Sequence, residues 1–262
     1  MPTAPTAGTA LPAPPMTPAG GGAGRRVLHV SPHPDDELLG AGATLALLRD
    51  QGWQVLNLAV SLGRRQDHDR RRAELLEAGR RLGIDIEICQ PSLDISRGDD
   101  LDRAETVLTE RLVEVIGRGP VDVVLGPHAE DVHPGHEVVG RAITRALEHT
   151  SRPVPWWAWG LWADLRTPNL FVPFGATVLR QVAFALEAYV GECARNGYQD
   201  LWPARSTANA VLGSERVFGF GAERASPLPY AELFLERHCR EGVWSASPSR
   251  MCDLDDPLGD SG

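Results

Sequence analysis

The sequence predicts an α/β fold in which a mostly parallel, Rossmann-like sheet is flanked by helices and followed by an irregular C-terminal extension. Short apolar runs alternate with segments of helical periodicity, and the run at 121–125 is almost wholly apolar, as in the middle of a parallel sheet. A strand, a polar turn and a helix follow one another at 27–50 and again at 121–146. Such recurring βα units imply a doubly wound sheet with right-handed crossovers.

The first half of the chain supplies elements with clear ends. The helix expected at 37–50 ends near Gly52, and the longest helix keeps apolar residues at helical spacing until Gly119 and Pro120 break it. The expected strands are 27–30, 53–60, 84–89 and 121–125, and the expected helices are 37–50, 70–82, 101–118 and one that begins near His136.

The second half gives weaker signals. Helical spacing of apolar residues predicts a helix at 178–193, and 214–221 and 230–239 are expected as late strands. Residues 154–162 hold four of the seven tryptophans. These side chains either pack in the core or stack on a sugar face, and the ease with which large aromatic groups are buried favours the core. They are Trp156, Trp157, Trp159 and Trp162.

No repeat or linker divides the chain, so we expect one domain over residues 25–245. Residues 1–24 are rich in Pro, Ala, Thr and Gly and carry no charge, which is typical of a disordered tail. The acidic segment 246–262 is expected to be a flexible tail.

Composition restricts the possible partners. The 262-residue chain has a net charge of −9, which leaves no long basic surface for nucleic acid, and no apolar run of about 20 residues predicts a membrane span. The four cysteines form no C-x-x-C pair, which argues against a zinc knuckle or a disulfide framework and favours a cytoplasmic location. Every basic residue is arginine, which excludes Schiff-base and P-loop lysine chemistry.

The strongest chemical signal is the turn P-H-P-D-D-E at 32–37, directly after the first strand. Adjacent carboxylates at such a place repel each other unless a cation or a proton offsets them. A divalent metal held by His33 and Asp36 would do so and would leave Asp35 free beside it. Helix capping is the alternative for these acids. A magnesium phosphoacceptor domain would also use paired acids, but it needs a lysine that the chain lacks.

A second polar turn, at 126–136, follows the strand at 121–125 and holds His133 and His136 three residues apart. Because the turn lies between a strand and a helix, both rings can face the crevice that holds His33 and Asp36. Two nitrogens and one carboxylate oxygen with an open fourth position are typical of a catalytic zinc site.

The two motifs together resemble the PIG-L and LmbE-like family of zinc-dependent de-N-acetylases. The resemblance covers about residues 26–147 and continues weakly through the tryptophan-rich segment. It implies that Zn²⁺ is bound by three ligands, that one acid is the general base, and that one histidine stabilises the oxyanion or protonates the leaving amine. The ligands would be His33, Asp36 and His136, the base Asp35, and the histidine His133.

The resemblance also implies two substrate contacts, from Arg71 and from Asp94, the latter to substrate hydroxyls. One departure concerns the second motif, where Gly135 replaces the aspartate usual in the family. Asp131 and Glu130 are candidates to replace that acid.

The expected function is therefore a zinc-dependent hydrolase that removes an N-acetyl or related N-acyl group from a small soluble substrate. Amino sugars, glycosides and antibiotic or thiol-cofactor intermediates are the candidate classes. Two alternatives stay open, namely a metal-dependent amidase acting on a larger amide or thiol conjugate, and a non-catalytic member of the family. A homo-oligomer is compatible with the sequence.

Overall fold

A computed structural model describes residues 24–96 and 101–259 and confirms the predicted α/β class. The predicted tail at 1–24 lies almost wholly outside this range. The strands are β1 (Arg26–Ser31), β2 (Gln54–Ala59), β3 (Asp85–Ile88), β4 (Val123–Pro127), β5 (Trp156–Trp159), β6 (Leu170–Phe174), β7 (Tyr230–Arg240), β8 (Val243–Ala246) and β9 (Arg250–Met251). The helices are α1 (Asp36–Asp50), the short 3-10 helix η1 (Arg65–Asp67), α2 (His68–Leu82), α3 (Leu101–Gly117), α4 (Pro134–Glu148), α5 (Ala176–Leu186), α6 (Val190–Arg195) and α7 (Tyr198–Phe218).

The sheet has the order β3-β2-β1-β4-β5-β7-β6-β9, with β8 paired to β7. The five strands from β3 to β5 are parallel, whereas β7 runs antiparallel to β5, β6 and β8. Because β1 and β4 are parallel neighbours, the turns that follow them lie at the same edge of the sheet.

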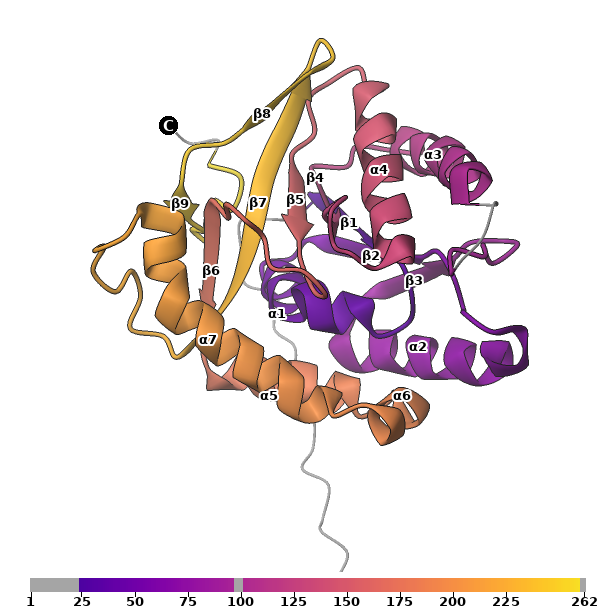
Figure 1. Cartoon of the computed structure of the whole chain (residues 1–262), viewed down its shortest axis with the longest axis horizontal. Coiled ribbons are helices and arrows are strands. Elements are labelled where there is room, and N and C mark those ends of the chain that lie inside the picture. The colour runs from indigo at the N-terminus through magenta and orange to yellow at the C-terminus, as the bar shows by residue number, and fades with distance from the viewer. Residues whose placement is uncertain (1–23, 97–100, 260–262) are drawn as a thin grey trace, which may run out of the picture.

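Helices cover both faces of the sheet, as Figure 1 shows. One buried cluster joins the sheet to α3 and α4 through Leu108 and Val139. The other joins it to α1, α2 and α5 through Leu45, Leu75 and Val182. Burial on both faces explains the nearly continuous apolar runs of β1 and β4.

Helix α1 is interrupted at Ala41, which has φ −150° and ψ 17°. The second half of the helix begins under the carboxylate of Glu232, from β7, which accepts hydrogen bonds from the backbone N–H groups of Ala43 (2.9 Å) and Thr44 (2.8 Å). The first half is thus a short segment that carries the acids of the turn.

The C-terminal part is more regular than predicted. Residues 214–218, expected as part of a strand, form the end of α7. The prediction was wrong because the closely spaced apolar residues Val217, Phe218 and Phe220 resemble a strand pattern. The helix expected at 178–193 is broken into α5 and α6, and β6 and α7 were not predicted. The predicted flexible tail is wrong for residues 250–252, since β9 pairs with β6 and the Cys252 side chain is buried.

No helix within the described ranges is long and apolar enough to cross a membrane.

Candidate metal centre and active site

The turn after β1 brings His33 and Asp36 into direct contact. The carboxylate oxygen Oδ2 of Asp36 accepts a hydrogen bond from the His33 backbone N–H at 2.9 Å and lies 3.2 Å from His33 Nδ1. Between them Asp35 adopts φ 101°, in the left-handed region that glycine, asparagine and aspartate enter more readily than other residues. This backbone conformation allows adjacent acids to face different surroundings.

The turn after β4 brings His136 to the same oxygen. His136 lies in the first turn of α4, is buried, and has Nε2 3.2 Å from Asp36 Oδ2. Ligand atoms of His33, Asp36 and His136 all lie within 4.8 Å of one another. The structure therefore brings together the three residues predicted as metal ligands.

These residues fit a divalent metal ion. His136 Nε2 is a buried nitrogen without a hydrogen-bond partner among the described residues, which is the pattern expected of a nitrogen that serves as a ligand to a metal ion. Two imidazole nitrogens and a carboxylate oxygen suit zinc and leave a coordination position for water or substrate. The donor set does not by itself select zinc among divalent metals.

Asp131 orients the His136 ring from behind. Its Oδ2 lies 2.5 Å from His136 Nδ1, while its Oδ1 accepts hydrogen bonds from the backbone N–H groups of residues 161–163 at 2.9 to 3.0 Å. A hydrogen bond of this kind fixes the tautomer and the direction of a metal-binding imidazole. Asp131 thus makes its hydrogen bond to His136 and none to His133, on which it acts only through its charge. Glu130 is exposed.

The carboxylates of Asp36 and Asp131 favour a positive charge at His136. Burial alone would lower the pKa of His136, but Asp36 and Asp131 on either side raise it to about 9. The pKa of Asp36 is held far below its ordinary value, because the two histidines outweigh its burial. A bound metal would take the place of the His136 Nε2 proton.

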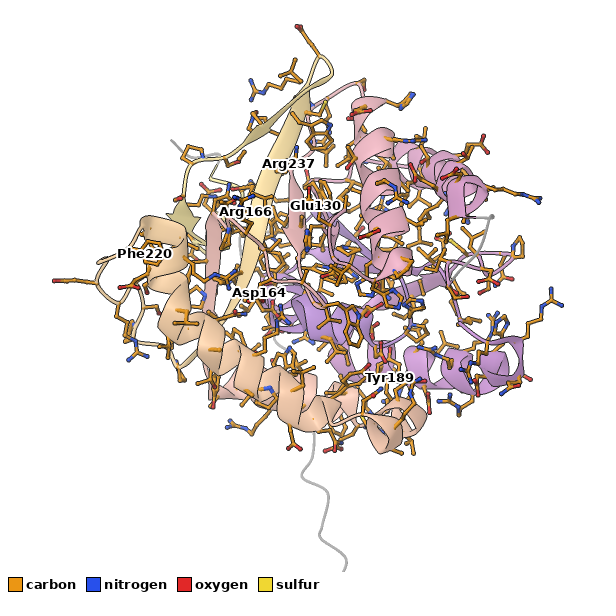
Figure 2. All side chains as sticks on the ribbon, viewed as in Figure 1. Glu130, Asp164, Arg166, Tyr189, Phe220 and Arg237 are labelled. Atoms are coloured by element: carbon orange, nitrogen blue, oxygen red, sulfur yellow. The ribbon has the colours of Figure 1, made fainter. Side chains whose placement is uncertain are left out.

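Asp35 is buried beside this centre, and its side chain neither caps α1 nor makes a hydrogen bond to any described residue. Its burial and the neighbouring Asp36 raise its pKa well above the ordinary value, opposed by Arg71. The Asp35 backbone N–H donates to Glu37 Oε2 at 3.1 Å, and Glu37 also accepts from the Tyr189 hydroxyl. Tyr189, labelled in Figure 2, is buried and lies between α5 and α6.

His133 is the N-cap residue of α4, and its Nδ1 accepts a hydrogen bond from the Gly135 N–H at 3.2 Å. The neutral ring therefore carries its proton on Nε2. Burial, together with the positive charge of His136 and His33, lowers the pKa of His133 to about 4. The ring lies 4.8 Å from His136 and 5.3 Å from His33, measured between centroids.

The space around residue 135 explains why a glycine occupies this position. A Cβ at this position would lie 3.0 Å from the Ile95 carbonyl oxygen and 3.1 Å from the His33 ring. The glycine thus permits a close approach of the 94–96 segment to the site.

The two predicted substrate contacts lie at different depths. Arg71 is mostly buried, and its guanidinium donates to the Pro34 carbonyl at 3.1 Å, which supports the turn that carries the acids. Asp94 is exposed and hydrogen-bonded to Ser96, next to the Ile95 that approaches Gly135.

The tryptophan-rich segment divides into two parts. Trp156, Trp157 and Trp159 are buried in the core, as favoured by the sequence. Trp159 also packs its edge against His136 and donates from Nε1 to Nε2 of His29, which is held by Asn57 at 2.8 Å. Sequence reasoning missed this buried histidine, because an isolated histidine carries no pattern.

Comparisons with known proteins agree with this geometry. Residues 28–147 match the PIG-L family, described as GlcNAc-PI de-N-acetylase. The chain is 31% identical over 147 residues to the probable N-acetyl-alpha-D-glucosaminyl L-malate deacetylase 2 of Bacillus cereus, a match that covers 50% of this chain and 66% of that protein, just under two thirds of its length.

Two solved structures share the fold. The zinc-inhibited form of teicoplanin deacetylase Orf2 has a TM-score of 0.62 and 17% identity, covering 86% of this chain and 100% of that one. The 4-carboxy-2-hydroxymuconate hydratase GalB of Pseudomonas putida KT2440 has a TM-score of 0.59 and 20% identity, covering 81% and 95%. The fold alone therefore does not fix the reaction. Both polar turns lie within the segment 28–147, over which the chain is similar to the PIG-L family.

Proposed function

We propose that this chain is a zinc-dependent hydrolase that removes an N-acetyl or related N-acyl group from a small substrate. Amino sugars, glycosides and antibiotic or thiol-cofactor intermediates are the substrate classes. The observation that carries the proposal is the convergence of two imidazoles and a carboxylate within 4.8 Å, beside a buried acid with no hydrogen bond to its side chain. The match of residues 28–147 to a family described as a de-N-acetylase supports an N-deacetylase.

His33, Asp36 and His136 would hold the metal. When bound there, Zn²⁺ lowers the pKa of a water molecule and polarises the amide carbonyl of the substrate. Asp131 keeps the His136 ring in the tautomer that leaves Nε2 free.

Asp35 is the general base of the proposal. Its raised pKa brings it toward the operating pH, where a carboxylate is an effective proton acceptor. It takes a proton from the attacking water and delivers it to the leaving amine. The Asp35 side chain makes no capping hydrogen bond to α1, which leaves it available for this role.

His133 stabilises the oxyanion as a neutral hydrogen-bond donor through Nε2–H. Its lowered pKa and the hydrogen bond accepted by Nδ1 favour this role over that of a protonated acid. Removal of one such donor costs about 3 to 4 kcal/mol, or a hundred- to thousandfold in turnover. Arg71 and Asp94 would contact the substrate, Asp94 through the substrate's hydroxyls, and Arg71 would also support the Asp35 turn through the Pro34 carbonyl.

The test combines metal content with acetate release from N-acetylglucosaminides. Asp35→Asn tolerates the left-handed backbone better than alanine does, and we expect it to retain zinc while losing most turnover. His136→Ala should lose both. An Asp35→Asn protein with a near-normal rate would contradict the assignment of the base.

The same measurements separate the alternatives. Turnover of larger amides or thiol conjugates without acetate release would favour the broader amidase. Bound zinc without hydrolysis of any amide would favour a non-catalytic member of the family.

A further inference from the structure

Trp162 is the one tryptophan of its segment that is exposed at the site. Its side chain is 54% exposed, whereas Trp156, Trp157 and Trp159 are at most 1% exposed. The Trp162 ring is stacked against His133, with ring centroids 6.0 Å apart and an interplanar angle of 26°. One face thus contacts a residue of the proposed active site and the rest of the ring is open.

The loop that carries Trp162 is fixed from two sides. Asp131 accepts hydrogen bonds from the N–H groups of residues 161, 162 and 163. From the other side the Arg205 guanidinium, on α7, donates to the carbonyls of Gly160 (2.7 Å) and Leu161 (2.8 Å). Five backbone groups of four residues are therefore held by two charged side chains. An aromatic ring on a loop ordered in advance loses little conformational entropy when a ligand covers it.

The same carboxylate links this loop to the metal centre. Asp131 binds the Trp162 backbone through Oδ1 and the His136 ring through Oδ2, so one side chain connects the backbone of this loop to the metal centre. A second exposed apolar residue, Val132, precedes His133 and is 66% exposed with φ 56°. A β-branched residue in this conformation is strained, and such strain concentrates at functional sites.

We propose that Trp162 is a stacking platform for a ring in the amine portion of the N-acylated substrate. This inference rests on the proposed function. An acetyl-sized acyl group cannot itself carry a ring, so the apolar face that covers the indole belongs to the amine that is released. A sugar ring, which presents C–H groups on one face, is the chemical class that fits.

The test uses two probes that share the acetamide and differ in the ring, methyl N-acetyl-β-D-glucosaminide and N-acetylethanolamine. We expect Trp162→Ala to lower kcat/KM for the glucosaminide by about tenfold and for the acyclic amide by less than about twofold, while Trp162→Phe retains most activity. Phe220→Ala is the control, because Phe220 is 95% exposed on the loop after α7, and Figure 2 shows it well apart from Glu130 and Tyr189. Equal losses on both probes would assign Trp162 to positioning His133 alone and overturn the proposal.

A binding measurement keeps this test independent of turnover. Trp162 is the most exposed of the seven tryptophans, so acrylamide quenching reports mainly on it. The glucosaminide should protect the wild-type fluorescence, and N-acetylethanolamine should not; in Trp162→Phe the protection should disappear. Protection of the fluorescence without acetate release would support the stacking role of Trp162 and contradict the proposed function. Acetate release with no protection at any glucosaminide concentration would overturn the platform alone.

Discussion

Replacing Asp131 with asparagine should weaken metal binding without loosening the fold. The carbonyl oxygen of the introduced asparagine side chain can still accept from the three N–H groups of residues 161–163, which leaves its NH₂ group facing His136 Nδ1. That ring nitrogen must then accept a hydrogen bond, so the ring proton moves to Nε2, the atom that points to Asp36. We expect zinc affinity to fall by about 10- to 100-fold.

Asp131→Ala should have a different effect, because it removes the acceptor of the three amides as well. Breaking a buried charged contact of this kind costs about 3 to 5 kcal/mol. In a domain of this size 1 kcal/mol corresponds to about 2–4 °C, so the Tm should fall by about 10 °C. Asp131→Asn should have a Tm close to that of the wild type.

The assay is competition of metal-stripped protein against a chromophoric zinc chelator, combined with thermal unfolding of the same samples. Glu130→Gln is the matched control, because it makes the same change of charge at the exposed neighbouring residue. Wild-type zinc affinity in Asp131→Asn would refute the role of Asp131 in orienting His136. Equal Tm values for the asparagine and alanine variants would refute its role in holding the loop.

Three further outcomes follow from single positions. Val132→Asn should raise the free energy of unfolding by about 1 kcal/mol in urea titration, because asparagine tolerates the left-handed backbone; no gain would mean that φ 56° is not strained. Gly135→Asp should lower stability by about 1 to 3 kcal/mol, since its Cβ meets the Ile95 carbonyl and the His33 ring; a variant as stable as the wild type would contradict the crowding. Burial raises the pKa of Glu232 to about 7, so the native state binds a proton that the unfolded state releases. The contribution of Glu232 to stability should therefore be fully present below pH 4.5 and fall by up to about 3 kcal/mol as the pH rises to 7. In urea titrations at several pH values, Glu232→Gln should remove this contribution to the slope.

The first half of the fold could be predicted because its signals are local. Apolar runs, glycine stops and polar turns lie within a few residues of one another, and the βα repeat fixes which turns share an edge of the sheet. The approach of His136 to His33 and Asp36 follows from that topology, since β1 and β4 are neighbours. Their roles as ligands stay predictions.

The second half could not be predicted because its order depends on distant partners. Strand β7 pairs with β5, β6 and β8, and no local period distinguishes the end of α7 from a strand when Val217, Phe218 and Phe220 follow one another. Likewise, nothing in the sequence separates Trp162 from the three buried tryptophans, because its exposure results from the loop that Asp131 and Arg205 hold.

The role of each buried acid near the metal centre can be inferred from the group to which it is hydrogen-bonded. Where the backbone departs from regular structure, N–H groups lose their usual acceptors, and carboxylates replace them. Glu37 serves the N–H of Asp35, Asp131 serves the loop at 161–163, and Glu232 serves the restart of α1 after Ala41, across up to 189 residues of sequence. Asp35 serves no such group, although it is buried. A carboxyl in buried surroundings without a hydrogen bond contributes nothing to stability through such a bond, so replacing Asp35 should change turnover more than stability.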